Sequence, residues 1–223
     1  KTIDIDPANP FKDVVKAKGK VNEQNLKLLL ISKDDEEIIS YQPRIIPYNS
    51  GLPPVVVPPA PPEEYMSNEL LYYAGERIRQ FHNARLEAED YFLEALKRDP
   101  YDVRCNTAMG IISQEHMDLE SAMSYYRKAI ERLTDNWTRP RDCEPLYHLG
   151  VVLKMEGKYN AAIDTLYRSV WDYKFRSAAY FQLAQIFTMQ KNYSEALYAV
   201  QNSLAVNSCN LNALNLKTSL LRL

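Results

Sequence analysis

The sequence predicts a mainly α-helical protein, in which about nine helices form a right-handed α-α superhelix behind a short β-hairpin and a Pro-rich linker. The first observation is the distribution of proline, because ten of the 13 prolines lie at or before Pro62. Proline blocks helix interiors, so a helical domain is expected only after that point. The second observation is a pair of small residues, twelve positions apart, that recurs after Pro62. Helices that repeat in this way stack into a solenoid.

Three segments follow: a β-domain remnant at 1–43, an extended linker at 44–64 and a helical domain at 65–223. Within the first segment, apolar runs at 26–31 and 38–41 flank a polar turn and predict a β-hairpin. An isolated hairpin is only marginally stable in water. Either it packs on the helices or its remaining strands lie upstream, and we favour the second interpretation.

The linker is rich in proline and valine between Leu52 and Pro62 and is expected to form polyproline II. It would serve either as a ligand for a proline-binding module or as a spacer along the helical domain of its own chain. The three valines favour the spacer, because a freely exposed linker gains nothing from apolar side chains. We therefore expect residues 53–62 to pack on the helical domain.

The small-residue pairs belong to a longer frame that recurs after 40 and then 34 residues. Small side chains let two antiparallel helices approach closely, and an aromatic residue or leucine fills the next gap. Three frames in phase resemble the tetratricopeptide repeat, a helix–turn–helix unit of 34 residues. The pairs are Gly110 with Ala122, Gly150 with Ala162, and Ala184 with Ala196.

A further repeat is expected before these three, because Phe92 and its neighbours fit the frame that ends at Pro100. Its first helix is atypical, since Glu76 takes the place of the small residue and Gly75 lies one position early. Terminal repeats often deviate in this way. At the other end, residues 211–223 predict a capping helix, so four hairpins and a cap are expected.

Some stretches are more specific than the general repeat, above all residues 138–150 (TRPRDCEPLYHLG) and 169–173 (SVWDY). With residues 96–100 and 104–110, they resemble the C-terminal region of a family of large bacterial proteins. In that family an uncharacterised galactose-mutarotase-like β-supersandwich domain precedes tetratricopeptide repeats, and residues 4–11 are similar to the stretch before those repeats. The resemblance implies a carbohydrate-utilisation setting without naming a reaction. It also implies that the sugar-handling domain, with any catalytic residues, lies upstream.

In the tetratricopeptide architecture, the fifth, ninth and twelfth positions of each first helix face a concave surface. These positions are rich in aromatic and amide side chains with scattered charge, which suits an apolar peptide, the Pro-Val linker or a neighbouring domain. The alternative is that the aromatic residues simply pack in the core. The inward Lys and Arg with paired Asn that clamp a carboxylate tail in other repeat proteins are absent as a set. The expected face comprises Tyr73, Arg77, Gln80, Thr107, Ile111, Gln114, Tyr147, Val151, Lys154, Phe181, Gln185 and Thr188.

The 40-residue step implies six extra residues near 137–142. Insertions in solenoids map to loops and often carry binding residues. Trp137, Arg139 and Arg141 are therefore candidate contact residues, and the alternative is a longer turn without a function.

Catalytic chemistry has little support in the sequence. The three histidines do not pair with Cys or carboxylate at metal-ligand spacing, and no Gly-rich phosphate loop is present, so no metal or cofactor is expected. Cys143 and His148 would form a nucleophile pair only if the thiol lay in an electropositive niche, and a structural cysteine is the favoured interpretation. Cys105 and Cys209 are expected to be buried small apolar residues.

Composition limits the function classes further. A net charge of −2 gives no general electrostatic case for binding nucleic acid or an anionic membrane. No apolar run approaches the roughly 20 residues that a membrane-spanning helix needs. We expect a non-catalytic scaffold that binds a protein or its own upstream domain, or alternatively an accessory module of a carbohydrate-active bacterial enzyme. Because the chain opens at Lys1, we expect a fragment or processed form, and localisation stays open with the cytoplasm favoured.

Overall fold

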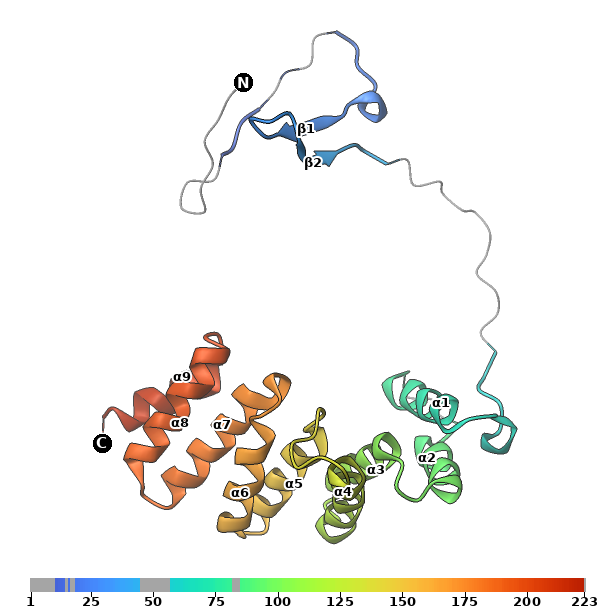
Figure 1. Ribbon diagram of the computed structural model, residues 1–223, viewed down its shortest axis with the longest axis vertical. Coiled ribbons are helices and arrows are strands. Elements are labelled where there is room, and N and C mark those ends of the chain that lie inside the picture. Colours follow the sequence, from blue (N-terminus) through green and yellow to red (C-terminus); the bar gives the residue numbers. More distant parts are fainter. Residues whose placement is uncertain (1–10, 15, 17–18, 45–56, 82–84, 223) are drawn as a thin grey trace. The chain divides into compact units, whose positions relative to one another are not determined.

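The computed structural model describes residues 11–14, 16, 19–44, 57–81 and 85–222 (Figure 1). The chain divides into two compact units, Lys1–Val57 and Pro58–Leu223. Most of the expected linker, residues 45–56, lies outside the described residues, as does the family-like stretch at 4–10. Among the residues that are described, no helix is long and apolar enough to span a membrane.

The first unit contains a β-hairpin, as the two apolar runs predict. A short 3₁₀ helix, η1 (Glu23–Asn25), precedes β1 (Leu28–Ile31) and β2 (Glu37–Tyr41), which pair antiparallel. The register shifts between Leu30 and Ile31, so that Ile31 faces Glu37. Leu30 is the one partly buried residue of the two strands, and their other residues are exposed.

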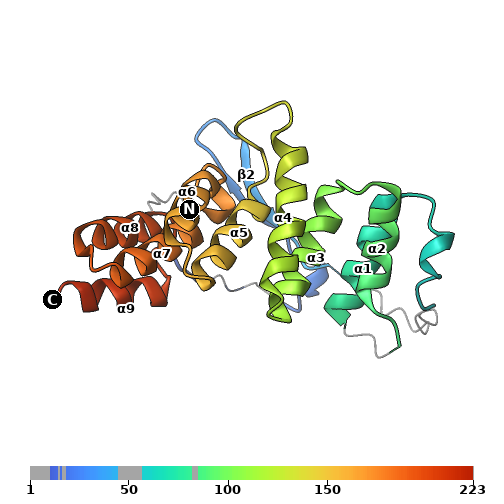
Figure 2. The same ribbon diagram turned by 90° about the horizontal axis from the view of Figure 1, so that it is seen from below.

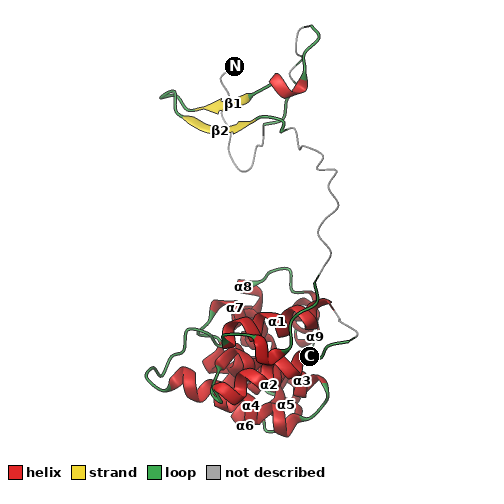
Figure 3. Cartoon of the chain, turned by 90° about the vertical axis from the view of Figure 1, so that its right-hand side faces the viewer, coloured by secondary structure: helices red, strands yellow, loops and turns green. Residues whose placement is uncertain are grey.

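The second unit is built from helices, and its described residues form nine of them after a 3₁₀ turn, η2 (Pro62–Glu64). Each odd-numbered helix up to α7 packs on the next one as a hairpin, and α9 packs on α8 (Figure 1). In Figure 3 the described regular structure of this unit is helical, and the two strands belong to the first unit. The predicted fold class is confirmed. The helices are α1 (Asn68–Phe81), α2 (Ala88–Arg98), α3 (Val103–Glu115), α4 (Leu119–Thr134), α5 (Glu144–Met155), α6 (Tyr159–Ser169), α7 (Tyr173–Met189), α8 (Tyr193–Val206) and α9 (Leu211–Leu220).

The two helices of a hairpin approach most closely at a small residue of the first helix. A Cβ added to Gly150 in α5 would lie 2.6 Å from Cγ of Leu166 in α6, well inside van der Waals contact. A large second-helix side chain therefore fills the space that a first-helix glycine leaves. The equivalent pairs are Gly75 with Phe92 and Gly110 with Tyr126. In the fourth hairpin the small residue is Ala184, and the smaller Val200 stands sixteen residues after it in the sequence.

The first hairpin corrects the expected frame by one position. Gly75, not Glu76, packs against Phe92 and is the small residue of α1. Phe92 follows Gly75 by seventeen residues, whereas the partner follows the glycine by sixteen in the next two hairpins. The connection between α1 and α2 is longer than those between α3 and α4 or α5 and α6, and it accommodates the extra residue.

The turn inside each of the next three hairpins ends in the same backbone conformation. Met117, Gly157 and Lys191 have positive φ angles of 62°, 74° and 60°. The residue after each donates its backbone N–H to a carbonyl five positions back, which closes the helix C-terminus as a Schellman motif. These positions recur after 40 and then 34 residues, the same steps as the small-residue frame.

The described end of the Pro-rich segment lies on the first helical hairpin. The Tyr91 hydroxyl donates a hydrogen bond of 2.8 Å to the Ala60 carbonyl, and the Arg98 guanidinium donates one of 2.7 Å to the Tyr65 carbonyl. The rings of Tyr65 and Tyr91 meet edge-on at 5.9 Å. The contact at Ala60 agrees with the expected packing of residues 53–62, of which 53–56 lie outside the described residues.

Candidate binding face of the helical unit

The candidate face is formed by the first helices of the hairpins. α5 contacts both α3 and α7, so that these three first helices lie next to one another. Each first helix packs the side that carries its small residue against its own second helix. A different side of the first helix therefore faces the neighbouring first helices. Side chains on that side come from different repeats and meet there.

At the N-terminal end of the face lies a pocket of about 100 Å³ between α1, α3 and the start of α5. α1 contributes Tyr72, Glu76 and Arg79 to its lining, and α3 contributes Arg104, Thr107 and Ile111 among others. Asp142 and Glu144 close it from the side of α5. Polar and charged groups from three repeats therefore meet around one small cavity.

The two guanidinium groups of this pocket already have partners. Arg79 forms an ion pair of 2.6 Å with Glu115, and Arg104 forms one of 3.3 Å with Glu69 while lying 5.1 Å from the centre of the Tyr72 ring. Glu76 has a weaker pairing, at 3.9 Å from Arg79. Burial raises the pKa of Glu76 above its ordinary value; Arg79 offsets part of this rise, and the nearby Glu144 and Glu115 carboxylates add to it. Its negative charge is therefore only partly compensated.

Aromatic rings and a histidine occupy the middle of the face. The His148 ring stacks on Tyr126 at 5.7 Å and meets the edge of Tyr147 at 5.3 Å, and Tyr147 in turn stacks on Phe175 of α7 at 5.3 Å. Burial, helped by the positive charges of Arg79 and Lys174, lowers the pKa of His148 to about 4. His148 is therefore neutral at pH 7 and acts as a packing group.

Lys154 and two glutamines make up the C-terminal part of the face. The Lys154 ammonium donates hydrogen bonds to Oε1 of Gln182 and, at 2.7 Å, to Oε1 of Gln185. The side chain is partly buried, and this burial lowers the pKa of Lys154. No ion pair to Lys154 occurs among the described residues, so the ammonium is held by neutral amide oxygens.

The structure brings the expected residues of α3, α5 and α7 together, in different environments. Thr107 is buried and donates to the Val103 carbonyl at 2.7 Å, and Gln114 accepts from the Tyr126 hydroxyl at 3.0 Å. Thr188 donates to the carbonyl of Ala184, so its hydroxyl is used within α7. The others are partly exposed: Ile111, Tyr147, Val151, Lys154, Phe181 and Gln185.

The expected residues of α1 are displaced by the one-position error in the frame. Tyr73, Arg77 and Gln80 are exposed, and none of them lines the pocket. Their places are taken by Tyr72, Glu76 and Arg79, each one residue earlier. These three residues are absent from the expected set because the sequence frame aligns Glu76 with the glycines of the later repeats. The glycine at 75 was the signal that would have corrected it.

The insertion between α4 and α5 is visible as a long loop (Figure 2). Arg139 packs on α6–α7, with its guanidinium 5.9 Å above the Trp171 ring and 3.4 Å from the Trp171 carbonyl. Trp137 is 75% exposed and Arg141 is also exposed. Trp137 and Arg141 are therefore the two candidate residues of this loop that stay available for a contact.

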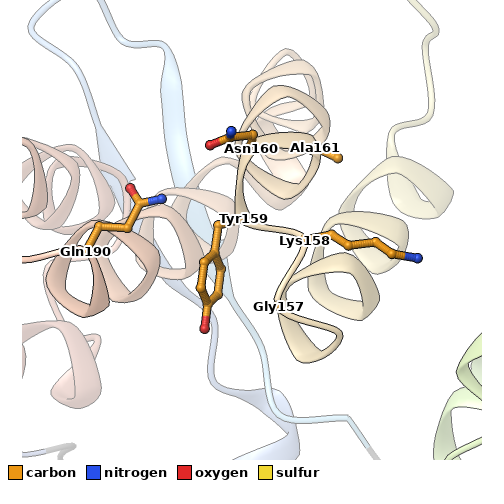
Figure 4. Close-up of a pocket in the computed structure, with 6 residues that line it drawn as sticks. All are labelled: Gly157, Lys158, Tyr159, Asn160, Ala161 and Gln190. Atoms are coloured by element: carbon orange, nitrogen blue, oxygen red, sulfur yellow. The ribbon is translucent and has the colours of Figure 1, made fainter.

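A second hollow, of about 400 Å³, lies at the turn between α5 and α6. Figure 4 shows the Tyr159 ring between Gln190 and the Gly157–Lys158 turn. The Tyr159 hydroxyl lies 3.9 Å from Sδ of Met189, and Lys158 is paired with Glu156 at 2.6 Å. The lining offers no unpaired charge, so this hollow carries no chemistry.

The cysteines do not form a catalytic centre. Cys143 is buried, its thiol faces the carbonyls of Pro140 and Arg168 at 3.8 Å, and burial together with Asp172 raises its pKa. Such a thiol is not a ready nucleophile. Among the described residues, no group of three or more His, Cys, Asp or Glu could hold a metal ion. The expectation that Cys209 is buried is wrong, because it lies exposed in the α8–α9 turn, while Cys105 is buried as expected.

Comparison with known proteins supports the fold. No family model matches the chain. Among solved structures, it is similar to the anaphase-promoting-complex hetero-tetramer Cut9–Hcn1, with 19% identity and a TM-score of 0.61 over 70% of this chain. It is also similar to Pseudomonas aeruginosa PilF, with 22% identity and a TM-score of 0.60 over 70% of this chain and 68% of that one. MamA gives 20% identity and 0.57 over 66% of this chain and 82% of that one.

These neighbours are tetratricopeptide-repeat superhelices, and the helical unit has the same fold. The match covers only 30% of the Cut9–Hcn1 chain. At these identities the likeness concerns the fold alone.

Proposed function

We propose that the helical unit is a non-catalytic scaffold that binds a segment of another protein, or another part of its own protein, through the face formed by α1, α3, α5 and α7. The observation that carries this proposal is the continuity of that face. Partly exposed aromatic, amide and charged side chains from successive repeats line it and are joined by contacts between repeats, as Tyr147 stacks on the buried Phe175 and Lys154 donates to Gln185. A tetratricopeptide fold supports the proposal because its stacked repeats create extended surfaces suited to recognition.

The chemistry of the face suits non-covalent recognition. Tyrosine combines a broad apolar ring with a polar tip, and such side chains are enriched where proteins meet. The face also offers amide groups at Gln182 and Gln185. The Cys143–His148 pair that the sequence offered does not form a nucleophile with its base, because the Cys143 thiol is buried against carbonyls and the His148 ring lies in an aromatic stack.

Site-specific photo-crosslinking in the source cells tests this proposal. A benzophenone amino acid would replace Val151, which lies on the face in α5, or Tyr198, which is 55% exposed on the second helix α8. We expect protein crosslinks from position 151 and at least tenfold fewer from position 198. Equal crosslinking from both positions, or none from 151, would contradict the proposal.

The second candidate is an accessory role in a carbohydrate-active bacterial protein with a galactose-mutarotase-like domain upstream. It is supported by the resemblance of residues 138–150 and 169–173 to the repeat region of that family. Calorimetric titration of this chain with mono- and oligosaccharides distinguishes the two candidates. Heat of binding from this chain would favour direct contact with sugar, and its absence would leave the face for a protein segment.

A further inference from the structure

Two charged groups of opposite sign on the binding face lack a full counter-charge among the described residues. Glu76 lies in the pocket that the start of α5 closes, and Lys154 lies in the last turn of α5. Both side chains are partly buried. A charge that is partly removed from water and incompletely paired is costly, so each group is a place where a ligand of the opposite charge would gain most.

The pocket at Glu76 favours a cation. The carboxylates in and around it outnumber their cationic partners by five to three, namely Glu69, Glu76, Glu115, Asp142 and Glu144 against Arg79, Arg104 and Lys174. Both guanidinium groups are already engaged with other carboxylates, so they offer little to an incoming anion. The volume of about 100 Å³ equals that of roughly three waters, which is enough for the head of a Lys or Arg side chain.

The site at Lys154 favours an anion. An ammonium group has three donors, and two of them are used by Gln182 and Gln185. These amide oxygens satisfy hydrogen bonds but bring no negative charge. A carboxylate that accepted the third hydrogen bond would supply the missing charge and restore the full stability of the protonated lysine.

The distance between the two sites follows from the helix that connects them. Glu144 and Lys154 are ten residues apart in α5, and at a rise of about 1.5 Å per residue their backbones lie about 15 Å apart. An extended peptide covers that distance in about five residues, at about 3.3 Å each. A helical peptide needs about ten residues for the same distance.

We propose that the face selects a partner segment that carries a basic and an acidic side chain about 15 Å apart. The basic side chain enters the pocket between α1, α3 and the start of α5, and the acidic side chain pairs with Lys154. Between them, Tyr147 and Val151 of α5 offer apolar contact. The inference rests on the proposed function and adds to it the charge pattern and the orientation of the partner. A segment placed with its acidic side chain at the pocket and its basic side chain at Lys154 would meet like charge at both ends.

A random 12-residue peptide display library, panned against the whole chain, tests this pattern without knowledge of the natural partner. We expect enriched peptides to share a Lys or Arg and an Asp or Glu, separated by about five positions if extended or about ten if helical. Glu76→Gln should remove the basic preference alone, and Lys154→Gln the acidic preference alone. Each substitution should weaken a selected peptide about tenfold, the scale of losing one partly buried charge pair.

Controls separate these effects from damage to the fold. Lys158→Gln removes an exposed lysine that is already paired with Glu156, and it should leave both preferences and all affinities unchanged. The two test variants remove incompletely paired charges, so their circular dichroism spectra should match that of the unaltered chain and their melting temperatures should be no lower. Neutralising Lys154 should even raise the melting temperature slightly, because a partly buried charge is removed.

The outcomes distinguish the two proposals. Enriched peptides that carry no charge pair, or charge preferences that survive both variants, would overturn this inference while leaving the proposed function in place. A failure to enrich any peptide would overturn both. If peptides are enriched, and each variant of the protein removes only the charge preference assigned to that residue, both proposals are supported.

Discussion

The close contact between paired helices predicts that one substitution lowers stability in the natural sequence and raises it when the contacting side chain has been shortened. The perturbation is Gly150→Ala in α5. The new Cβ would lie 2.6 Å from Cγ and 2.7 Å from Cδ2 of Leu166, which is fully buried. Because Cγ is the branch point of the side chain, rotation about χ2 leaves it in place, and relief requires a different χ1 rotamer or a shift of the two helices.

The magnitude follows from two opposing contributions. Overpacking of this kind costs about 1–3 kcal/mol. Alanine gains about 1 kcal/mol over glycine inside a helix. We therefore expect Gly150→Ala to lower the free energy of unfolding by about 1 kcal/mol, which corresponds to a fall of roughly 2–4 °C in melting temperature.

The same substitution should stabilise the protein when Leu166 is first shortened. Leu166→Ala alone should cost about 2–5 kcal/mol, because it removes a buried side chain and leaves a cavity. In that background the Cβ at position 150 meets no clash, so Gly150→Ala should regain about 1 kcal/mol. Ala184→Gly is the matched control: alanine is the natural residue at the equivalent position of α7, and its loss should cost about 1 kcal/mol.

Urea unfolding followed by circular dichroism measures the four members of the cycle. The account requires a coupling between positions 150 and 166 of about 2 kcal/mol, the difference between the two effects of Gly150→Ala. Stabilisation of similar size in both backgrounds would refute the reasoning. The glycine would then have no packing role.

Three further predictions follow from single residues. Gly157→Ala should lower the free energy of unfolding by about 1 kcal/mol through its positive φ alone, because the added Cβ would meet no other atom within 4 Å. Met117→Gly at the equivalent turn should raise the free energy of unfolding by a similar amount, and thermal melts measure both changes. The pKa of His148 is lowered to about 4 in the folded protein and lies below its unfolded value, so the unfolded chain binds more protons between these pH values. Stability should therefore fall as the pH drops from about 6.5 toward 4. His148→Phe should flatten that part of the pH profile of stability. Ellman's reagent should label Cys209 rapidly in the native protein and Cys143 only on unfolding, so that Cys209→Ser abolishes the fast phase.

The repeat frame could be read from the sequence because the close packing of paired helices depends on single residue types. Gly110 and Gly150 are needed where a large side chain of the second helix approaches, so their spacing reports the fold directly. The register of α1 was misread because one extra residue in a connection moves the whole helix relative to its partner, so that a fixed spacing points to Glu76. The glycine at 75 was the available signal, and its contact with Phe92 reveals the shift.

The binding face was less predictable than the fold. The frame located Lys154. It did not indicate that Gln182, in the first helix of the next repeat and outside the expected set, would share the Lys154 ammonium with Gln185. In the same way, nothing in the spacing indicates that His148 stacks on Tyr126. Such contacts join residues from different repeats, and they depend on how neighbouring first helices are placed rather than on any local pattern.

Chemical-shift mapping of the whole chain with the most enriched library peptide tests most directly that the first helices form the binding surface. The account predicts that backbone amide resonances shift in α1, α3, α5 and α7, with the largest shifts near Glu76 and Lys154. Resonances of the second helices, such as those around Tyr198 in α8, should stay in place. Shifts confined to the second helices or to α9 would contradict the account.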